Sequence, residues 1–308
     1  MKTCLIAGGS GFIGSWLCKD LLKKGNRVIC LDNNITGSES NISEIIKDKN
    51  FTFINHDITK PIKLSCHIDF VFHLASPASP VHYQKYPIET LMSNSVGTFN
   101  MLNLAKDNNA KLLYASSSEI YGDPKEHPQK ETYRGNVNPN GPRSCYDESK
   151  RFSEALITSF SGVRWTIVRI FNTYGPNMSK NDGRIAPNLI NQAINQRPIT
   201  IYGKGKQTRS FCYISDMIDG IERAMFSKKS AGEVINLGNP DEINMIEFAN
   251  LIISLTGSKS KMIFENLPAD DPKRRCPDIS KAQEILSWSP KVNIRDGLAA
   301  TIEYFRSV

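Results

Sequence analysis

The sequence lacks any long hydrophobic run, and this excludes an ordinary helical membrane protein. None of its apolar stretches approaches the ~18 residues that a membrane-spanning helix needs. Residues 1–3 lead directly into a short apolar stretch, which leaves no room for the successive regions of a signal peptide. We therefore expect a cytoplasmic protein with no membrane partner.

Paired cysteines are also lacking. The seven cysteines are odd in number, are scattered along the chain and form no CxxC pair. Such a pattern is typical of reduced thiols, and it differs from the spacing of a zinc site or of a disulfide framework. The sequence predicts no metal site.

A strong excess of one charge is absent as well. The net charge of +7 at pH 7 is moderate, and the chain has no long basic block. Nucleic acid is therefore not expected as a partner, and binding of an anionic small substrate explains the positive net charge equally well. Hydrophobic content of 40% and charged content of 22% are ordinary for a globular protein, and 308 residues suit one large domain or two modest ones.

What the sequence does contain begins with a glycine-rich turn. Gly8, Gly11 and Gly14 follow an apolar stretch at 4–7 that predicts a short buried strand, and they open a stretch of helical spacing at 12–24. Glycine lets the backbone approach a phosphate closely, and the N–H groups at the start of a helix point toward an anion. This context indicates a site for the pyrophosphate of a dinucleotide.

An acidic residue ends the next expected strand. Residues 28–31 are apolar and are followed by Asp32, about 20 residues beyond the glycines. Its carboxylate would accept hydrogen bonds from the adenosine ribose and would repel a 2′-phosphate. The sequence therefore predicts NAD as the cofactor, in preference to NADP.

Strand-like and helix-like segments alternate through the first half of the chain. Further strands are expected at 51–57, 70–75, 112–118 and 165–170, and a helix is expected over 87–107. This alternation predicts an α/β fold, a Rossmann-type doubly wound parallel sheet with helices on both faces. Ligands of such a sheet lie beyond the carboxyl ends of its strands.

The pattern changes after about residue 171, where loops rich in Asn, Gly and Pro separate shorter elements. We therefore divide the chain into an NAD-binding Rossmann domain, residues 1–171, and a smaller C-terminal substrate lobe, residues 172–308. Some segments of this lobe are expected to return to the main sheet.

A tyrosine and a lysine stand one helical turn apart. Tyr146 and Lys150 are four residues apart, which places the phenol and the ammonium on one face of a helix. A free phenol has a pKa of ~10 and is a poor base at neutral pH. Lys150, together with the positive charge of oxidised nicotinamide, would favour the phenolate and lower that pKa. With Ser117 donating to the same substrate oxygen, these residues predict the oxidation of an alcohol by a nicotinamide cofactor.

Several longer stretches resemble a known enzyme family, and together they cover essentially the whole chain. The matching stretches are residues 73–80, 115–124, 141–148, 169–176, 181–184, 207–211, 270–275 and 277–279. They resemble the extended short-chain dehydrogenases/reductases that act on nucleotide sugars, and among these the UDP-glucuronate decarboxylases. The resemblance implies NAD-dependent oxidation at C4, loss of the C6 carboxylate from a 4-keto intermediate to give UDP-xylose, and a homodimer or a dimer of dimers.

The resemblance also implies roles for individual residues. Tyr146 is the base, Lys150 binds the nicotinamide ribose, and Ser117 occupies a position usually held by threonine. Glu119 and Arg275 handle the carboxylate and the C5 position. The implied cofactor contacts are Gly8, Gly11, Phe12, Ile13, Gly14, Asp32, Asn33, Asp57, Ile58, Leu74, Ala75, Ser76, Tyr146 and Lys150. The implied contacts to the nucleotide sugar are Pro77, Asn172, Arg184, Tyr202, Arg209 and Arg275.

Ser118 and Glu119 are both predicted to be catalytic residues. Ser118 also distinguishes this chain from relatives that catalyse other reactions on nucleotide sugars. Dehydratase relatives carry an aspartate where this chain has Ser118, and a serine cannot protonate a departing hydroxyl near neutral pH. Epimerases usually carry neutral residues at both positions. One alternative stays open, namely a C4 dehydrogenase or epimerase of another nucleotide sugar, such as a GDP-hexose or GDP-heptose, in polysaccharide biosynthesis. Two departures keep it open: Asn177 stands where decarboxylases typically carry arginine, and the 150–171 segment is about three residues shorter than in them.

The expected helices at 87–107 and 146–160 carry apolar residues in excess of what one subunit is expected to cover. We therefore expect these helices to form the interface of a homodimer. The candidate interface residues are Leu91, Val96, Met101 and Leu102.

Overall fold

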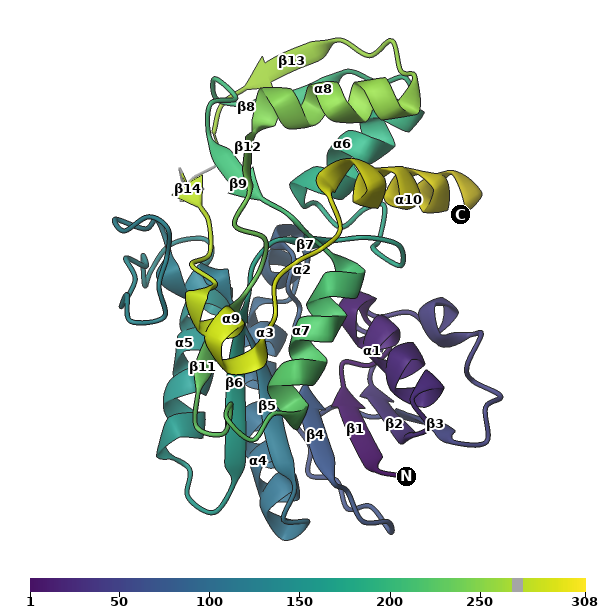
Figure 1. Cartoon of the computed structure of the whole chain (residues 1–308), viewed down its shortest axis with the longest axis vertical. Helices are drawn as coiled ribbons and strands as arrows, with labels where there is room; N and C mark the ends of the chain where they lie inside the picture. Colours follow the sequence, from purple (N-terminus) through teal and green to yellow (C-terminus); the bar gives the residue numbers. More distant parts are fainter. Residues whose placement is uncertain (268–273) are drawn as a thin grey trace.

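A seven-stranded sheet organises the chain, in the strand order β11-β6-β5-β4-β1-β2-β3 (Figure 1). The computed structural model describes residues 1–267 and 274–308. The strands are β1 (Thr3–Ala7), β2 (Arg27–Asp32), β3 (Phe51–Asn55), β4 (Phe70–His73), β5 (Lys111–Ser117), β6 (Arg164–Ile170) and β11 (Val234–Leu237). Every pairing between neighbours in this sheet is parallel. The predicted Rossmann-type doubly wound α/β fold is confirmed.

The strand order reverses at β1, and this reversal positions the site. β1 pairs with β2 on one side, where Ala7 faces Leu31, and with β4 on the other, where Ala7 faces His73. Connections leave β1 and β4 in opposite directions, so a crevice opens beyond their carboxyl ends. The glycine-rich turn begins at Gly8, directly at this point.

Alternate residues of each strand pack against helices on opposite faces. On one face, Cys4 and Ile6 of β1 join a core with α1 (Phe12–Lys23) and α7 (Ile214–Phe226). On the other face, Leu5 and Ala7 join a core with α4 (Thr98–Asp107) and α5 (Ser144–Ser159). Because both faces are buried, the central residues of β1, β2, β4 and β5 are apolar in succession rather than alternately polar.

The expected helix over 87–107 forms with an interruption. It consists of α3 (Pro87–Met92), a π-helical turn η2 (Ser93–Gly97) and α4. Met101 and Leu102 of α4 are fully buried against the sheet of their own subunit. Both were expected at a subunit interface, and this expectation is wrong because the helical period turns these residues toward the core. The large apolar side chains that these helices and α5 leave exposed are Ile88, Leu91, Met92, Phe99 and Phe152.

The remaining elements form smaller sheets and a separate group of helices. β12 (Glu242–Asn244), β9 (Thr208–Ser210) and β14 (Arg274–Arg275) form one sheet, β13 (Met262–Glu265) pairs with β8 (Ile199–Tyr202), and β10 (Cys212–Tyr213) pairs with β7 (Thr173–Tyr174). Helices α6 (Ile185–Ile194), α8 (Met245–Thr256) and α10 (Ile294–Ser307) pack around a further apolar core. Shorter helices are η1 (Glu39–Ile42), α2 (Pro80–Lys85), η3 (Ser118–Tyr121) and α9 (Ser280–Leu286).

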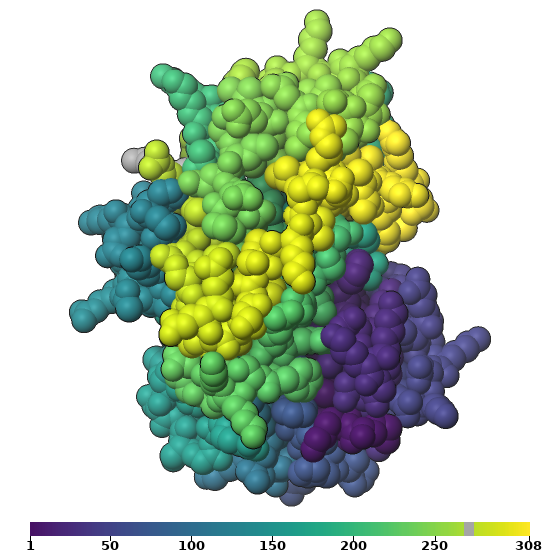
Figure 2. Space-filling model, in the orientation of Figure 1, coloured from purple at the N-terminus to yellow at the C-terminus, as the bar shows by residue number. Residues whose placement is uncertain are grey.

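Segments near the C-terminus contact both parts of the molecule. α9 packs beside β11 of the main sheet, whereas α10 packs with α6 and α8. Figure 2 shows these residues, in yellow, crossing the visible face from the sheet to the upper group of helices. The domain boundary at residue 171 stays a prediction. No helix in the described part of the chain combines the length and the apolarity that a bilayer crossing requires.

Candidate active site

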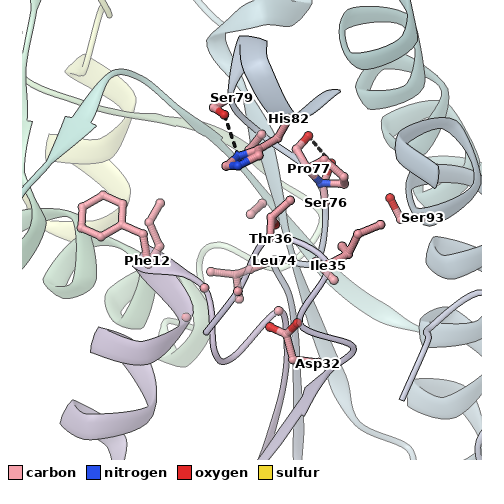
Figure 3. A pocket seen from close by; sticks show the side chains of 18 of the residues that line it. Phe12, Asp32, Ile35, Thr36, Leu74, Ser76, Pro77, Ser79, His82 and Ser93 are labelled. Atoms are coloured by element: carbon pink, nitrogen blue, oxygen red, sulfur yellow. Dashed lines mark hydrogen bonds between the residues drawn. The ribbon is translucent and has the colours of Figure 1, made fainter. Parts of the chain in front are cut away.

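A cavity of about 750 Å³ opens beyond the carboxyl ends of the strands around β1 (Figure 3). All of the residues predicted to contact the cofactor line it: Gly8, Gly11, Phe12, Ile13, Gly14, Asp32, Asn33, Asp57, Ile58, Leu74, Ala75, Ser76, Tyr146 and Lys150. Of the other predicted site residues, Pro77, Ser117, Ser118, Glu119, Asn172 and Arg184 also line it. Residues from the ends of six strands and from α1, α5 and η3 therefore meet in one space.

The glycine-rich turn is shaped so that no side chain fits. Gly8 has a φ of +84°, and a Cβ on it would lie 2.7 Å from the backbone nitrogen of Ala75. A Cβ on Gly14 would lie 2.0 Å from the carbonyl oxygen of Gly8. α1 begins at Phe12, and Gly11 before it has no side chain to cap the first N–H groups of the helix. This cradle fits a pyrophosphate, because those N–H groups can bind its oxygens.

Asp32 is held in a fixed orientation at the end of β2. Its Oδ2 accepts a hydrogen bond of 3.0 Å from the backbone N–H of Ser10, and its Oδ1 accepts one of 2.9 Å from that of Asn34. Figure 3 shows Asp32 at one end of the cavity, below the Phe12 ring of α1. A carboxylate in this place suits ribose hydroxyls and disfavours an added phosphate.

Lys150 and Tyr146 lie side by side on α5. The Lys150 ammonium donates a hydrogen bond of 2.8 Å to the carbonyl oxygen of Ala115, and it lies 4.7 Å from the centre of the Tyr114 ring. Burial lowers the pKa of Lys150 to about 7, although Glu154 opposes that shift. The Tyr146 ring stacks on Tyr83, with the ring centres 5.2 Å apart.

The pKa of Tyr146 differs from the expectation. Burial raises it to about 12, and the hydrogen bond with Ser117 offsets only part of that rise. Burial also lowers the pKa of the neighbouring Lys150, which weakens the positive charge that Lys150 can hold beside the phenol. Oxidised nicotinamide would add positive charge that favours the phenolate.

Glu119 is clamped by two arginines. Arg275 donates through Nη2 to Oε2 at 2.7 Å and through Nη1 to Oε1, and Arg143 donates through Nη2 to Oε2. Burial by itself would raise the pKa of Glu119, but the charges of Arg143 and Arg275 lower it to about 2. The resemblance implies that Glu119 and Arg275 handle the carboxylate and the C5 position, and this role stays a prediction. The structure pairs the two residues directly with each other.

Asp147, which the sequence did not single out, lies beside this cluster. Its Oδ2 lies 3.8 Å from Nε of Arg143, while its Oδ1 is buried without a hydrogen-bond partner. Burial and the charge of Glu119 raise the pKa of Asp147 to about 8. Arg143 was missed as well, although it stands three residues before Tyr146, at the start of the same helix.

The predicted nucleotide-sugar contacts separate into two groups. Arg184 lines the cavity and is fixed by Asp182, with Nη2 donating to Oδ2 at 2.7 Å. Asn172 lines it too, and its Nδ2 donates to the carbonyl oxygen of Ser210 at 3.3 Å.

Three of the predicted contacts do not line the cavity, namely Tyr202 at the exposed end of β8, Arg209 in β9, and Arg275, which reaches the site through Glu119. They stay predictions. Residues 270–273 of the matching 270–275 stretch lie outside the described residues.

Asn177, which stands where decarboxylases typically carry arginine, also lines the cavity. Its side chain donates a hydrogen bond of 3.2 Å to the Ser15 hydroxyl on α1, and its φ is +70°. Asparagine tolerates this left-handed conformation better than most residues.

Further lining residues that the sequence did not single out include His82 and Ser79, which are joined by a hydrogen bond of 2.8 Å (Figure 3).

Comparison with known proteins agrees with this geometry. Residues 4–238 match the NAD dependent epimerase/dehydratase family. The chain belongs to this family. UDP-glucuronic acid decarboxylase 1 of Xenopus tropicalis is 48% identical over 308 residues, which are 99% of this chain and 72% of the relative. UDP-glucuronic acid decarboxylase 6 of Arabidopsis thaliana is 48% identical over 98% of this chain and 88% of its own length.

Solved structures of family members have the same architecture. UDP-glucuronic acid 4-epimerase from Bacillus cereus, in complex with UDP-glucuronic acid and NAD, superposes with a TM-score of 0.86 at 29% identity over 99% of both chains. Pal from Bacillus thuringiensis gives a TM-score of 0.89 at 30% identity over 99% of both chains. The expectations of an extended short-chain dehydrogenase/reductase, of an enzyme and of NAD as the cofactor are confirmed.

Proposed function

We propose that this enzyme converts UDP-glucuronate to UDP-xylose by NAD-dependent decarboxylation. The observation that carries the proposal is the ion pair of Glu119 with Arg275, because Glu119 lines the same cavity as Tyr146. The chain is also 46–48% identical, over nearly its whole length, to named UDP-glucuronic acid decarboxylases. The alternative, a C4 dehydrogenase or epimerase of another nucleotide sugar, is not favoured by these relatives.

The first step is oxidation at C4 of the sugar. NAD, when bound, accepts the hydride from C4 and later returns it. Tyr146 takes the proton of the C4 hydroxyl, and Ser117, which is hydrogen-bonded to Tyr146, holds the same oxygen in line. The Lys150 ammonium lies 5.7 Å from the centre of the Tyr146 ring and 4.7 Å from that of the Tyr114 ring, so it can hold positive charge beside the phenolate.

Loss of carbon dioxide then follows from the ketone. The C6 carboxylate stands β to the C4 carbonyl, so breaking the C5–C6 bond sends its electron pair to the C4 oxygen. Donors fixed near that oxygen, Ser117 and protonated Tyr146, stabilise the negative charge that develops there. A proton from solvent then adds to C5. When the hydride returns from the reduced cofactor to C4, Tyr146 gives its proton back to the C4 oxygen, which restores the alcohol.

Glu119 is not the acid of this reaction. With a pKa of about 2 it stays ionised near neutral pH and has no proton to give. We infer that it holds Arg143 and Arg275 in place behind the part of the cavity that Glu119 lines, so that the net positive charge of the three groups favours binding of an acidic sugar.

We also propose a homodimer in the cytoplasm. Helices α3, α4 and α5 pack against one another and leave exposed apolar side chains on their outer surfaces. A second copy of this surface would cover them in a two-fold interface. The cytoplasm fits the cysteines, all seven of which are free.

The deciding experiment supplies the purified enzyme with NAD and UDP-glucuronate. We expect release of carbon dioxide and formation of UDP-xylose without net accumulation of NADH, and we expect no turnover of a neutral GDP-hexose. NADH accumulation without carbon dioxide, or turnover of the neutral sugar alone, would overturn the proposal.

A further inference from the structure

Three potential metal ligands meet outside the catalytic cavity. His127 Nε2 lies 2.8 Å from Glu242 Oε2, and these atoms and Cys276 Sγ all lie within 4.8 Å of one another. None of the three residues lines the catalytic cavity. His127 and Glu242 face solvent, whereas Cys276 is buried behind them. An ion can therefore reach the thiol from the exposed side.

The backbone around this cluster is already fixed. The N–H of Gln129 donates to the carbonyl oxygen of Cys276 at 2.9 Å, and the N–H of Cys276 donates to Oε1 of Gln129 at 2.9 Å. These two bonds tie the loop of His127 to the segment of Cys276. Glu242 begins β12, which pairs with β9, and β9 also pairs with β14 just before Cys276.

The bonds that orient the side chains leave the ligand atoms available. Glu242 receives a hydrogen bond of 2.5 Å from Thr208 on Oε1, which leaves Oε2 toward His127. The Cys276 thiol donates to the carbonyl oxygen of Pro240 at 3.2 Å, so its sulfur lone pairs are not used in that bond. Little rearrangement is needed to bring one sulfur, one nitrogen and one oxygen around an ion.

The local charge also favours a cation. The carboxylates of Glu242, Asp241 and Asp278 lie close enough to the Cys276 sulfur to act on it electrostatically. Their negative charges attract a divalent ion, which binds the sulfur as a thiolate and displaces its proton to solvent.

We propose that His127, Glu242 and Cys276 form a binding site for Zn²⁺ or a similar divalent transition-metal ion, separate from the catalytic centre. Thiolate, imidazole and carboxylate are the ligands that zinc takes in proteins, at about 2.3 Å for sulfur and about 2.0–2.2 Å for nitrogen and oxygen. Tetrahedral coordination at these lengths separates ligand atoms by about 3.3–3.8 Å. The His127–Glu242 contact of 2.8 Å would open slightly, and the Cys276 sulfur, which lies within 4.8 Å of both other atoms, would approach the ion by about 1 Å or less. Water completes the fourth position on the exposed side.

The site is connected to the catalytic centre through one peptide bond. Arg275, which clamps Glu119, directly precedes Cys276 in the chain. An ion held by Cys276 therefore ties the segment carrying Arg275 to β12 and to the loop of His127. We expect zinc to raise the melting temperature of the enzyme for this reason.

The test uses the full-length enzyme, freed of metal with a chelator. Cobalt is added first, because a thiolate bound to Co²⁺ gives a charge-transfer band that other cysteines cannot give without binding the ion. Zinc is then titrated against a chromophoric chelator to obtain stoichiometry and affinity. We expect one equivalent of zinc per chain, a cobalt–thiolate band, and displacement of that band by zinc.

Three variants locate the ion. Cys276→Ser and His127→Asn should weaken zinc binding by at least about tenfold, and Cys276→Ser should abolish the cobalt band. Cys66→Ser is the matched control, because Cys66 is a partly exposed thiol outside the cluster. This variant should leave the zinc affinity and the cobalt–thiolate band unchanged. Absence of the band in the unmodified enzyme, or equal zinc affinity in Cys276→Ser, would show that the cluster is not a metal site.

Discussion

Glu119 and Arg275, which are 156 residues apart in the sequence, form a two-point ion pair in which both terminal nitrogens of the guanidinium contact the carboxylate. Arg143 contacts the same carboxylate from the start of the helix that carries Tyr146. The Glu119–Arg275 pair therefore joins β14 to η3, and Arg143 joins both to the start of α5. Two arginines and one glutamate leave a net positive charge close to a cavity that is proposed to accept an acidic sugar.

Arg275→Lys should lower the rate of carbon dioxide release while leaving NAD affinity nearly unchanged. Lysine keeps the charge but cannot make the two parallel bonds to Glu119, and loss of one charged hydrogen bond costs about 1.5–3 kcal/mol, or roughly 10–100-fold. The rate is followed with UDP-glucuronate, and NAD binding is measured by titration. Arg223→Lys is the control, because Arg223 forms an exposed i,i+4 pair with Asp219 away from the cavity. An unchanged rate in Arg275→Lys would contradict the role given to the pair.

Tyr146→Phe should abolish C4 oxidation and leave NAD binding intact. The ring can still stack on Tyr83, but the proton acceptor is gone, and loss of a general base costs about 10²–10⁴-fold. Single-turnover formation of NADH measures this step. Tyr83→Phe is the matched control, because it removes a buried hydroxyl from the neighbouring ring and should retain turnover. Near-normal turnover in Tyr146→Phe would mean that another residue is the base.

Asp32→Ala should weaken the discrimination between NAD and NADP. The carboxylate is oriented by two backbone N–H groups, and its removal takes away both the ribose contact and the repulsion of a 2′-phosphate. The preference should change by about 1–3 kcal/mol. Titration of both cofactors measures it, with Asp48→Ala, an exposed acid on the same half of the molecule, as the control. Equal affinities for NAD and NADP in the unmodified enzyme would contradict the role assigned to Asp32.

Glu119→Gln should lower the free energy of unfolding at neutral pH by about 3–5 kcal/mol, because it leaves buried arginines without their carboxylate. The pKa of Glu119 falls from 4.5 to about 2 on folding. Its contribution to stability is therefore present above about pH 4.5 and is lost as the pH falls toward 2. Urea unfolding from pH 7 to pH 3 should show the difference between wild type and variant shrinking with acidity. A difference that stays constant with pH would rule out the ionised pair as its source.

Phe152→Asp should convert the proposed dimer to monomers. Phe152 is 52% exposed on α5, beside the exposed residues of α3 and α4, and a charge there would have to be desolvated in the interface. Sedimentation at micromolar concentration measures the change. Phe264→Asp is the control, since Phe264 is similarly exposed on β13 and should leave the dimer intact. A wild-type monomer would refute the proposed assembly.

The sequence by itself determined the parts of this protein whose geometry is local. The spacing of Gly8, Gly11 and Gly14 after an apolar strand specifies a tight strand-to-helix turn, in which Gly14 packs directly on the carbonyl of Gly8. The separation of Tyr146 and Lys150 specifies one helix face, and Asp32 is placed by the strand that it ends. For these residues the chain supplies both the group and its position, so the NAD-binding half was predictable.

Only the tertiary structure decided what depends on contacts between distant segments. Sequence showed neither that two arginines neutralise Glu119 nor that Met101 faces the core of its own subunit. It also gave no sign that His127, Glu242 and Cys276 meet, because His127 and Glu242 are 115 residues apart and no spacing rule relates them. Such contacts are set by how β14, β12 and the loop of His127 are joined by backbone hydrogen bonds. That pairing depends on the packing of the whole chain, and burial then fixes the charge state of each group that it brings together.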